Sequence, residues 1–174
     1  MSLLKEIFGA RKAPAQVRTL YDNIVVAGRD PRWYVEGGVP DTIDGRFDMI
    51  AALLALVLLR LEADGDASRV ASIALTEIFV DDMEGSLRQI GIGDLVVGKH
   101  VGRMMGALGG RLGAFRDAAS NGQDLTAAVR RNIFHEAPPS EDAPIFVASR
   151  LDHFRKQLDA FGAAKIRAGA LPLP

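Results

Sequence analysis

Residues 49–59 read MIAALLALVLL, and this run decides the fold class of the 174-residue chain. Eleven consecutive apolar residues are too few to span a bilayer, since a membrane-spanning helix needs about 20. Because the run is apolar on every side, it predicts a helix at the centre of a folded core. Pro40 and the capping candidates Asp41, Thr42 and Asp44 stand at its start, so the helix is expected to extend from about Pro40 through Arg60.

Apolar residues recur at helical spacing on both sides of this run, and the alternation typical of β-strands is nearly absent. We therefore predict an all-α fold, a single-domain bundle of about six or seven helices over residues 1–174. A short helix is expected over 125–135 and a C-terminal helix over about 144–163, and the tail 169–174 is expected to fray. The predicted irregular or turn segments are 29–40, 64–66, 91–93, 121–122 and 137–144.

Charge and composition exclude several classes of protein. The 21 basic and 22 acidic residues give a net charge of −1, so we expect no nucleic-acid partner. The chain has no cysteine, which excludes disulfides and thiolate metal sites. The three histidines lack the short helical spacing of a metal site, and no metal or cofactor is predicted.

The N-terminal segment over residues 2–10 predicts a short amphipathic helix. Leu3, Leu4, Ile7 and Phe8 share its apolar face, and basic residues surround them. Two interpretations stay open, namely contact with a membrane surface and docking on the chain's own core. The segment has no basic region ahead of an apolar run, so it does not resemble a secretory signal, and we expect a cytoplasmic protein.

Residues 93–99 read GDLVVGK and match a phosphate-binding loop up to its lysine, Lys99. His100 then stands where a magnesium-binding hydroxyl is required, and the preceding residues are helical in pattern where a strand is required. A simpler interpretation is a helix that ends at glycine, a turn, and a further helix capped by Asp94.

Carboxylates gather at Asp81, Asp82 and Glu84, a pattern typical of the magnesium sites that hold diphosphates in helical prenyl-transfer enzymes. Such enzymes use two clusters, and the sequence has no second one. Glu84 and Arg88 are spaced as an ordinary helical ion pair. Asp82 lies at the edge of the apolar stripe, where a charge is expected to meet a partner group, from its own chain or from another.

A row of glycines follows one face of the helix predicted after residue 94. Each glycine inside a helix is destabilising by roughly 0.5–1 kcal/mol relative to alanine, so a close contact should offset the loss. A neighbouring helix of the same domain is the commoner reason for such a row, and a ligand or a partner segment is the alternative. The row comprises Gly98, Gly102, Gly106, Gly109 and Gly113.

Trp33 and Tyr34 lie in the segment predicted to be irregular. Two roles fit an aromatic pair in such a place: it anchors a binding partner or covers the core.

Two groups of motifs resemble the ubiquinol–cytochrome c chaperone family. The first is VPDTIDGRF at 39–47, followed by the apolar helix. The second group comprises DDM at 81–83, LR at 87–88, GIGDL at 91–95 and VGK at 97–99. The similarity covers roughly residues 20–118.

The resemblance implies an assembly chaperone that does not catalyse a reaction, because mitochondrial members bind newly made cytochrome b and help it enter the respiratory complex. The expected partner is cytochrome b or another subunit of that complex, met at the inner face of the bacterial membrane. The alternative is a helical enzyme or carrier for an isoprenoid or diphosphate that uses Asp81, Asp82 and Lys99 with magnesium. The candidate partner-binding residues are Trp33, Arg46, Asp82, Arg88, Asp94, Lys99, Gly102 and Gly106.

Overall fold

The computed structural model describes residues 14–89, 91 and 93–174, so the helix predicted over 2–10 lies outside the described residues. Within these ranges the chain is helical and contains no β-strand, which confirms the all-α prediction. Of the helical segments that the structure describes, six have seven residues or more, and two are single turns of five. The segments are α2 (Ala15–Gly28), α3 (Pro31–Val35), α4 (Ile43–Glu62), α5 (Asp66–Gln89), α6 (Asp94–Ser120), α7 (Thr126–Asn132), α8 (Asp142–Phe161) and α9 (Ala163–Arg167).

Helix α4 holds the apolar run and is the centre of the bundle, as predicted. Thr42 occupies its N-cap, where the side-chain oxygen accepts a hydrogen bond of 3.1 Å from the backbone N–H of Gly45. Residues 49–58 are all buried. Helices α2, α5, α6, α8 and α9 pack around α4, which accounts for a helix without a polar face.

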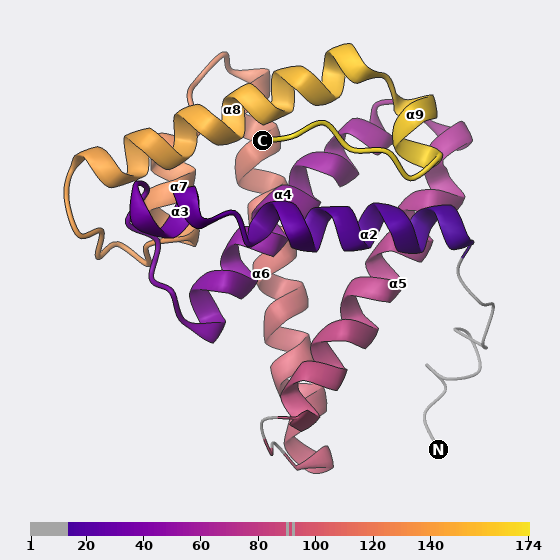
Figure 1. The fold of residues 1–174 in the computed structure, drawn as a ribbon, viewed down its shortest axis with the longest axis horizontal. Helices are drawn as coiled ribbons and strands as arrows, with labels where there is room; N and C mark the ends of the chain where they lie inside the picture. The colour runs from indigo at the N-terminus through magenta and orange to yellow at the C-terminus, as the bar shows by residue number, and fades with distance from the viewer. Residues whose placement is uncertain (1–13, 90, 92) are drawn as a thin grey trace.

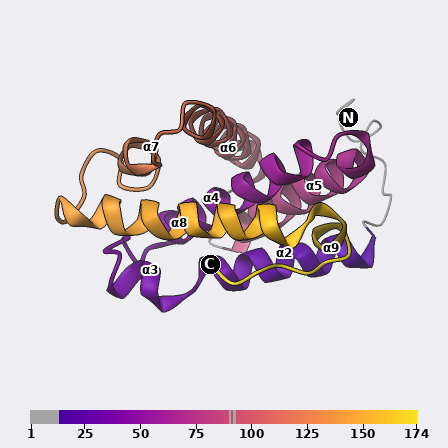
Figure 2. The ribbon, with the colours of Figure 1, turned by 90° about the horizontal axis from the view of Figure 1, so that it is seen from above.

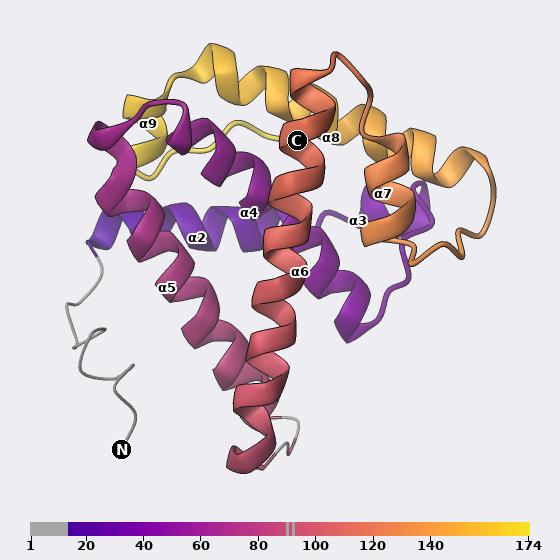
Figure 3. The ribbon, with the colours of Figure 1, turned by 180° about the vertical axis from the view of Figure 1, so that it is seen from behind.

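The other helices are arranged in layers about α4. Helix α2 and helix α6 lie on opposite sides of the molecule, with α4 and α8 between them (Figure 2). Helices α5 and α6 converge into a hairpin that projects beyond the rest of the bundle (Figure 1). Helix α6 then runs along the face seen in Figure 3, so that one side of it has no helix in front of it.

Helix α2 ends against α4 at a very close approach. A Cβ atom added to Gly28, the last residue of α2, would lie 2.8 Å from Cγ1 of Ile50. Atoms at that distance overlap, so only glycine allows the two helices to pack this closely. The apolar face predicted for this segment is confirmed, since Val17, Leu20 and Ile24 are buried.

The prediction of an irregular segment over 29–40 was wrong at α3. Asp30 is the N-cap of this turn and accepts a 2.9 Å hydrogen bond from the backbone N–H of Arg32, while Pro31 takes the first helical position. Asp followed by Pro is a helix-start signal, and five residues are too few to show periodicity. The turn places Trp33 in the core, where Nε1 donates to the Ala27 carbonyl at 2.9 Å.

The two C-terminal expectations also need correction. Helix α7 ends at Asn132 and not at 135, because His135 and Glu136 adopt left-handed backbone angles (φ 50° and 64°). The tail 169–174 was expected to fray but lies against the bundle. Asn23 donates to the Gly169 carbonyl at 3.0 Å, and Arg150 donates to the Pro174 backbone oxygen at 2.9 Å.

Candidate functional site

The glycine row lies on the open side of α6. Apart from the backbone of α6 itself, no heavy atom of the described residues lies within 4 Å of the Cβ that would be added at any of its five members. Four of the five are exposed, and Gly113 is intermediate. The expectation that a helix of the same domain packs on the row was therefore wrong for the part of the chain that the structure describes. Nothing described in this chain offsets the destabilisation that the glycines cause.

Apolar side chains border the row on one edge. Val101, Met105 and Leu112 are half-buried, and the last two also pack against the core. The other edge is basic, since Lys99 and Arg103 are exposed. The row with these borders forms what we call the glycine face: a strip of bare backbone between a partly covered apolar edge and a basic edge. A helix or an extended segment could approach its backbone closely, because no side chain intervenes.

Asp82 of α5 is hydrogen-bonded to α2. Tyr21 of α2 donates its hydroxyl hydrogen to Oδ2 of Asp82 at 2.7 Å. Burial, reinforced by this hydrogen bond, raises the pKa of the Tyr21 hydroxyl, which therefore stays a donor. The boundary carboxylate thus meets a partner group from its own chain, one of the two possibilities that its position left open.

The carboxylate cluster does not assemble into a metal site. Glu84 pairs with Arg88 at 3.5 Å, as the spacing predicted, and Asp81 is exposed. Within residues 14–89, 91 and 93–174, no three His, Asp or Glu side chains are arranged to hold a metal ion. The magnesium-dependent alternative therefore gains no support from the geometry.

The near-match to a phosphate-binding loop lies between two helices. Helix α5 precedes it, Gly91 has the left-handed φ of +86°, and Gly93 is the N-cap of α6. The helix–turn–helix interpretation is confirmed with one correction: Asp94, expected as the cap, is the first residue of the helix. A phosphate loop requires a strand before it, so this context excludes the standard motif.

Residues 35–169 match the family model described as ubiquinol-cytochrome C chaperone. The chain belongs to the ubiquinol–cytochrome c chaperone family. A crystal structure of the Cbp3 homolog from Brucella abortus superposes with a TM-score of 0.82 at 28% identity, covering 99% of this chain and 97% of that chain. Comparison with the curated proteins gives no match.

Family membership accounts for the motifs without assigning catalytic residues. Both groups of motifs fall within the matched residues, and the family is one of chaperones for the ubiquinol–cytochrome c complex. No helix that the structure describes has the length and apolar character needed to cross a membrane.

The remaining predicted contact residues lie on different elements of this chaperone. Arg46 is near the start of α4 and donates from Nε to Asp41 Oδ1 at 2.7 Å, with more than half of each side chain exposed. Trp33 is fully buried, so in this structure it covers the core and does not present a surface for a partner. Lys99, Gly102 and Gly106 lie together on α6.

Sequence reasoning missed a buried charged cluster. Arg111 of α6 is 1% exposed and forms an ion pair with Asp48 of α4, which is 4% exposed. Arg111 also donates to the Asn132 carbonyl at 2.5 Å, and Asp48 Oδ2 lies 2.8 Å from His135 Nε2. These bonds hold the chain where α7 stops. Arg111 comes three residues after Leu108 and four before Phe115, so it falls on the apolar face of this helix. A charged residue on that face was the sequence feature that could have indicated a buried ion pair.

Proposed function

We propose that this chain is an assembly chaperone that binds a hydrophobic subunit of the ubiquinol–cytochrome c reductase complex, cytochrome b in particular, on the glycine face of α6. Family membership supports the chaperone role and a partner within that complex. We choose this surface because the glycine row on it is not covered by any described residue.

Five glycines in one helix lower the stability of that helix. At about 0.5–1 kcal/mol each, they destabilise α6 by several kcal/mol, and no described residue packs on them in return. A partner helix that lies on the row would regain part of this loss through close backbone contact. Transmembrane helices pack against one another through such small-residue strips, so the face suits a helix of a membrane protein.

The chemistry of the borders supports the same partner. Met105 and Leu112 offer half-buried apolar surface beside the row, and methionine adapts its shape to different apolar side chains. A newly made membrane subunit exposes apolar helices before it is inserted, and covering one of them would delay aggregation. We place this contact at the cytoplasmic face of the membrane, where such a subunit is inserted.

Co-purification tests the proposal directly. The full chain, purified in mild detergent from its native host, should recover cytochrome b. Replacing Gly102 and Gly106 with leucine should reduce that recovery at least tenfold, because the new side chains stand where the partner backbone would lie. Gly85→Leu is the matched control, since Gly85 is a helical glycine of α5 that also faces open space.

Two outcomes would contradict the proposal. One is recovery of no subunit of the complex by the wild-type chain. The other is equal recovery by the Gly102→Leu/Gly106→Leu variant and by the Gly85→Leu control, which would exclude the glycine face. Deletion of the gene should also lower the amount of assembled complex in the membrane.

A further inference from the structure

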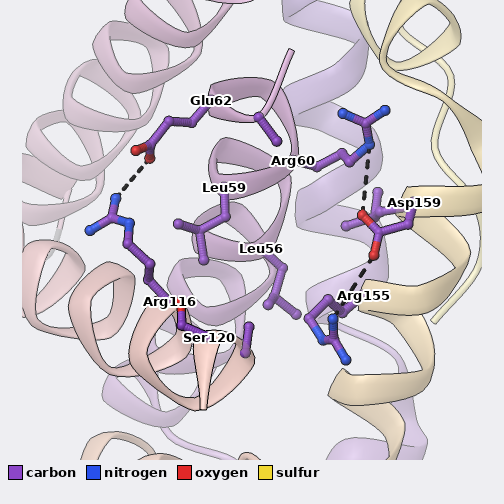
Figure 4. Close-up of a pocket in the computed structure, with 11 residues that line it drawn as sticks. Leu56, Leu59, Arg60, Glu62, Arg116, Ser120, Arg155 and Asp159 are labelled. Atoms are coloured by element: carbon purple, nitrogen blue, oxygen red, sulfur yellow. Dashed lines mark hydrogen bonds and ion pairs between the residues drawn. The ribbon is translucent and has the colours of Figure 1, made fainter. Parts of the chain in front are cut away.

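A cavity of about 380 Å³ opens at the C-terminal end of the glycine face (Figure 4). Residues near the C-terminal ends of α4, α6 and α8 line it. Leu56, Leu59 and Leu158 supply apolar lining, and three arginines from three different helices stand at its edge. The site is thus an apolar hollow with three guanidinium groups and the carboxylates of Glu62 and Asp159 at its edge, and none of the sequence motifs pointed to it.

The cavity continues the helical face that carries the glycines. From Gly113 the spacings of three and four residues that define the row lead to Arg116 and then to Ser120. Both of these residues line the cavity. One end of a partner helix that lies along the row would therefore be located at the cavity.

The three arginines at the edge are only partly occupied by carboxylates. Arg116 pairs with Glu62 at 2.7 Å, with both side chains about half exposed or more. Asp159 lies 3.8 Å from Arg60 Nε and 3.9 Å from Arg155 Nη1, beyond hydrogen-bond distance for either. Arg155 donates instead from Nε and Nη2 to Asp152 Oδ1, at 3.0 and 2.7 Å. Arg60 and Arg116 therefore keep guanidinium hydrogens for further acceptors, whereas Arg155 is mostly engaged by Asp152.

We propose that this cavity receives the C-terminal end of the partner helix that lies on the glycine face. The last carbonyl groups of a helix have no intrahelical donor and carry partial negative charge. Arg60 and Arg116 would donate to them, while a terminal apolar side chain would fill the hollow over Leu56. The partner helix then runs parallel to α6. This inference rests on the function proposed above and adds the direction of binding.

Site-specific photo-cross-linking tests that direction. A photoreactive phenylalanine analogue is placed at Lys99 or at Ser120, at opposite ends of the glycine face, in the full chain. Cytochrome b of the same host is translated in its presence in mild detergent, and mass spectrometry locates the cross-linked residues. Position 120 should cross-link nearer the C-terminal end of one client helix, and position 99 nearer its N-terminal end.

The double variant Arg60→Gln/Arg116→Gln should lower the cross-link from position 120 at least tenfold and leave that from position 99 unchanged. Arg69→Gln/Arg131→Gln, on exposed residues of α5 and α7, is the control and should change neither. The single variant Arg116→Gln keeps the test valid if the double variant fails to fold, because Arg116 is about half exposed.

The outcomes separate the two proposals. A reversed order of cross-links, attachment of position 120 to a different helix or to lipid, or no effect of the arginine variants would overturn the inference while the glycine face stands. Absence of cross-links from both positions would overturn the proposed function as well.

Discussion

The Tyr21 hydroxyl donates a 2.7 Å hydrogen bond to Asp82, and this contact joins α2 to α5 across 61 positions of sequence. The tyrosine is 2% exposed, so water can hardly replace Asp82 as the acceptor for its hydroxyl. A carboxylate that sequence patterns associated with magnesium thus has a structural role in the fold.

Removing either partner of this bond should destabilise the protein. We expect Tyr21→Phe and Asp82→Ala each to lower the free energy of unfolding by about 1–3 kcal/mol, the usual effect for a hydrogen bond to a charged group or for a buried hydroxyl left without an acceptor. Urea denaturation of both single variants and the double variant should give a coupling energy of at least about 0.5 kcal/mol. Asp81→Ala, next in sequence and exposed, should change stability little, and strictly additive effects would contradict the contact.

Replacement by alanine should have opposite effects on stability at an uncovered glycine and at a glycine packed closely against another helix. Gly106→Ala should raise the free energy of unfolding of the isolated protein by about 0.5–1 kcal/mol, because alanine favours helix and the position is open. Gly28→Ala should lower it, since the new Cβ overlaps Ile50. Thermal melts of both variants measure the contrast. Destabilisation by Gly106→Ala would mean that another segment of this chain already packs on the glycine row.

Breaking the buried ion pair should have the largest effect. Arg111→Met leaves Asp48 without its guanidinium partner and is expected to destabilise the fold by about 3–5 kcal/mol. Combining it with Asp48→Leu should restore most of that loss, because a buried pair replaced by apolar groups is close to neutral. Arg131→Met, at an exposed arginine of α7, is the control for loss of a positive charge. Failure of the double variant to recover stability would show that the pair has another role.

Magnesium with geranyl diphosphate distinguishes the chaperone from the isoprenoid enzyme or carrier. A ligand at 100 times its dissociation constant stabilises the folded state by about 2.7 kcal/mol, which would raise the melting temperature by several degrees. We expect no shift, because the described carboxylates do not form a metal site. A shift that is lost in Asp81→Ala would revive the enzyme hypothesis.

The helices were predictable from the sequence wherever an apolar stripe was long enough to show a period. The run in α4, the stripes of α2 and α8, and the turn at Gly91 all follow from local pattern and capping residues. Helix α3 was missed because one turn has no period, although Asp30 and Pro31 carried its start signal.

Long-range pairings were not predictable in the same way. Arg111 with Asp48, and Tyr21 with Asp82, join residues more than 60 positions apart, and no local rule relates them. The same reason explains the error at the end of α7, where Arg111 binds the Asn132 carbonyl. The glycine row was predicted to be a contact surface, but whether this chain or another covers it depends on tertiary arrangement. The cavity beside Arg116 forms from three helices and has no signature in any one of them.

Arg111 is an anchor point about which the projecting N-terminal part of α6 could tilt. The guanidinium joins α6, at a point about two-thirds of the way along it, to α4 and to the last residue of α7. The N-terminal end of α6 projects with α5 beyond the bundle (Figure 3). At about 1.5 Å per residue, positions 94 to 111 span about 25 Å, so a tilt of about 10° at this fulcrum moves the free end by about 4 Å. Amide hydrogen exchange should therefore slow from the tip toward Arg111, and a client seated along the arm should flatten that gradient.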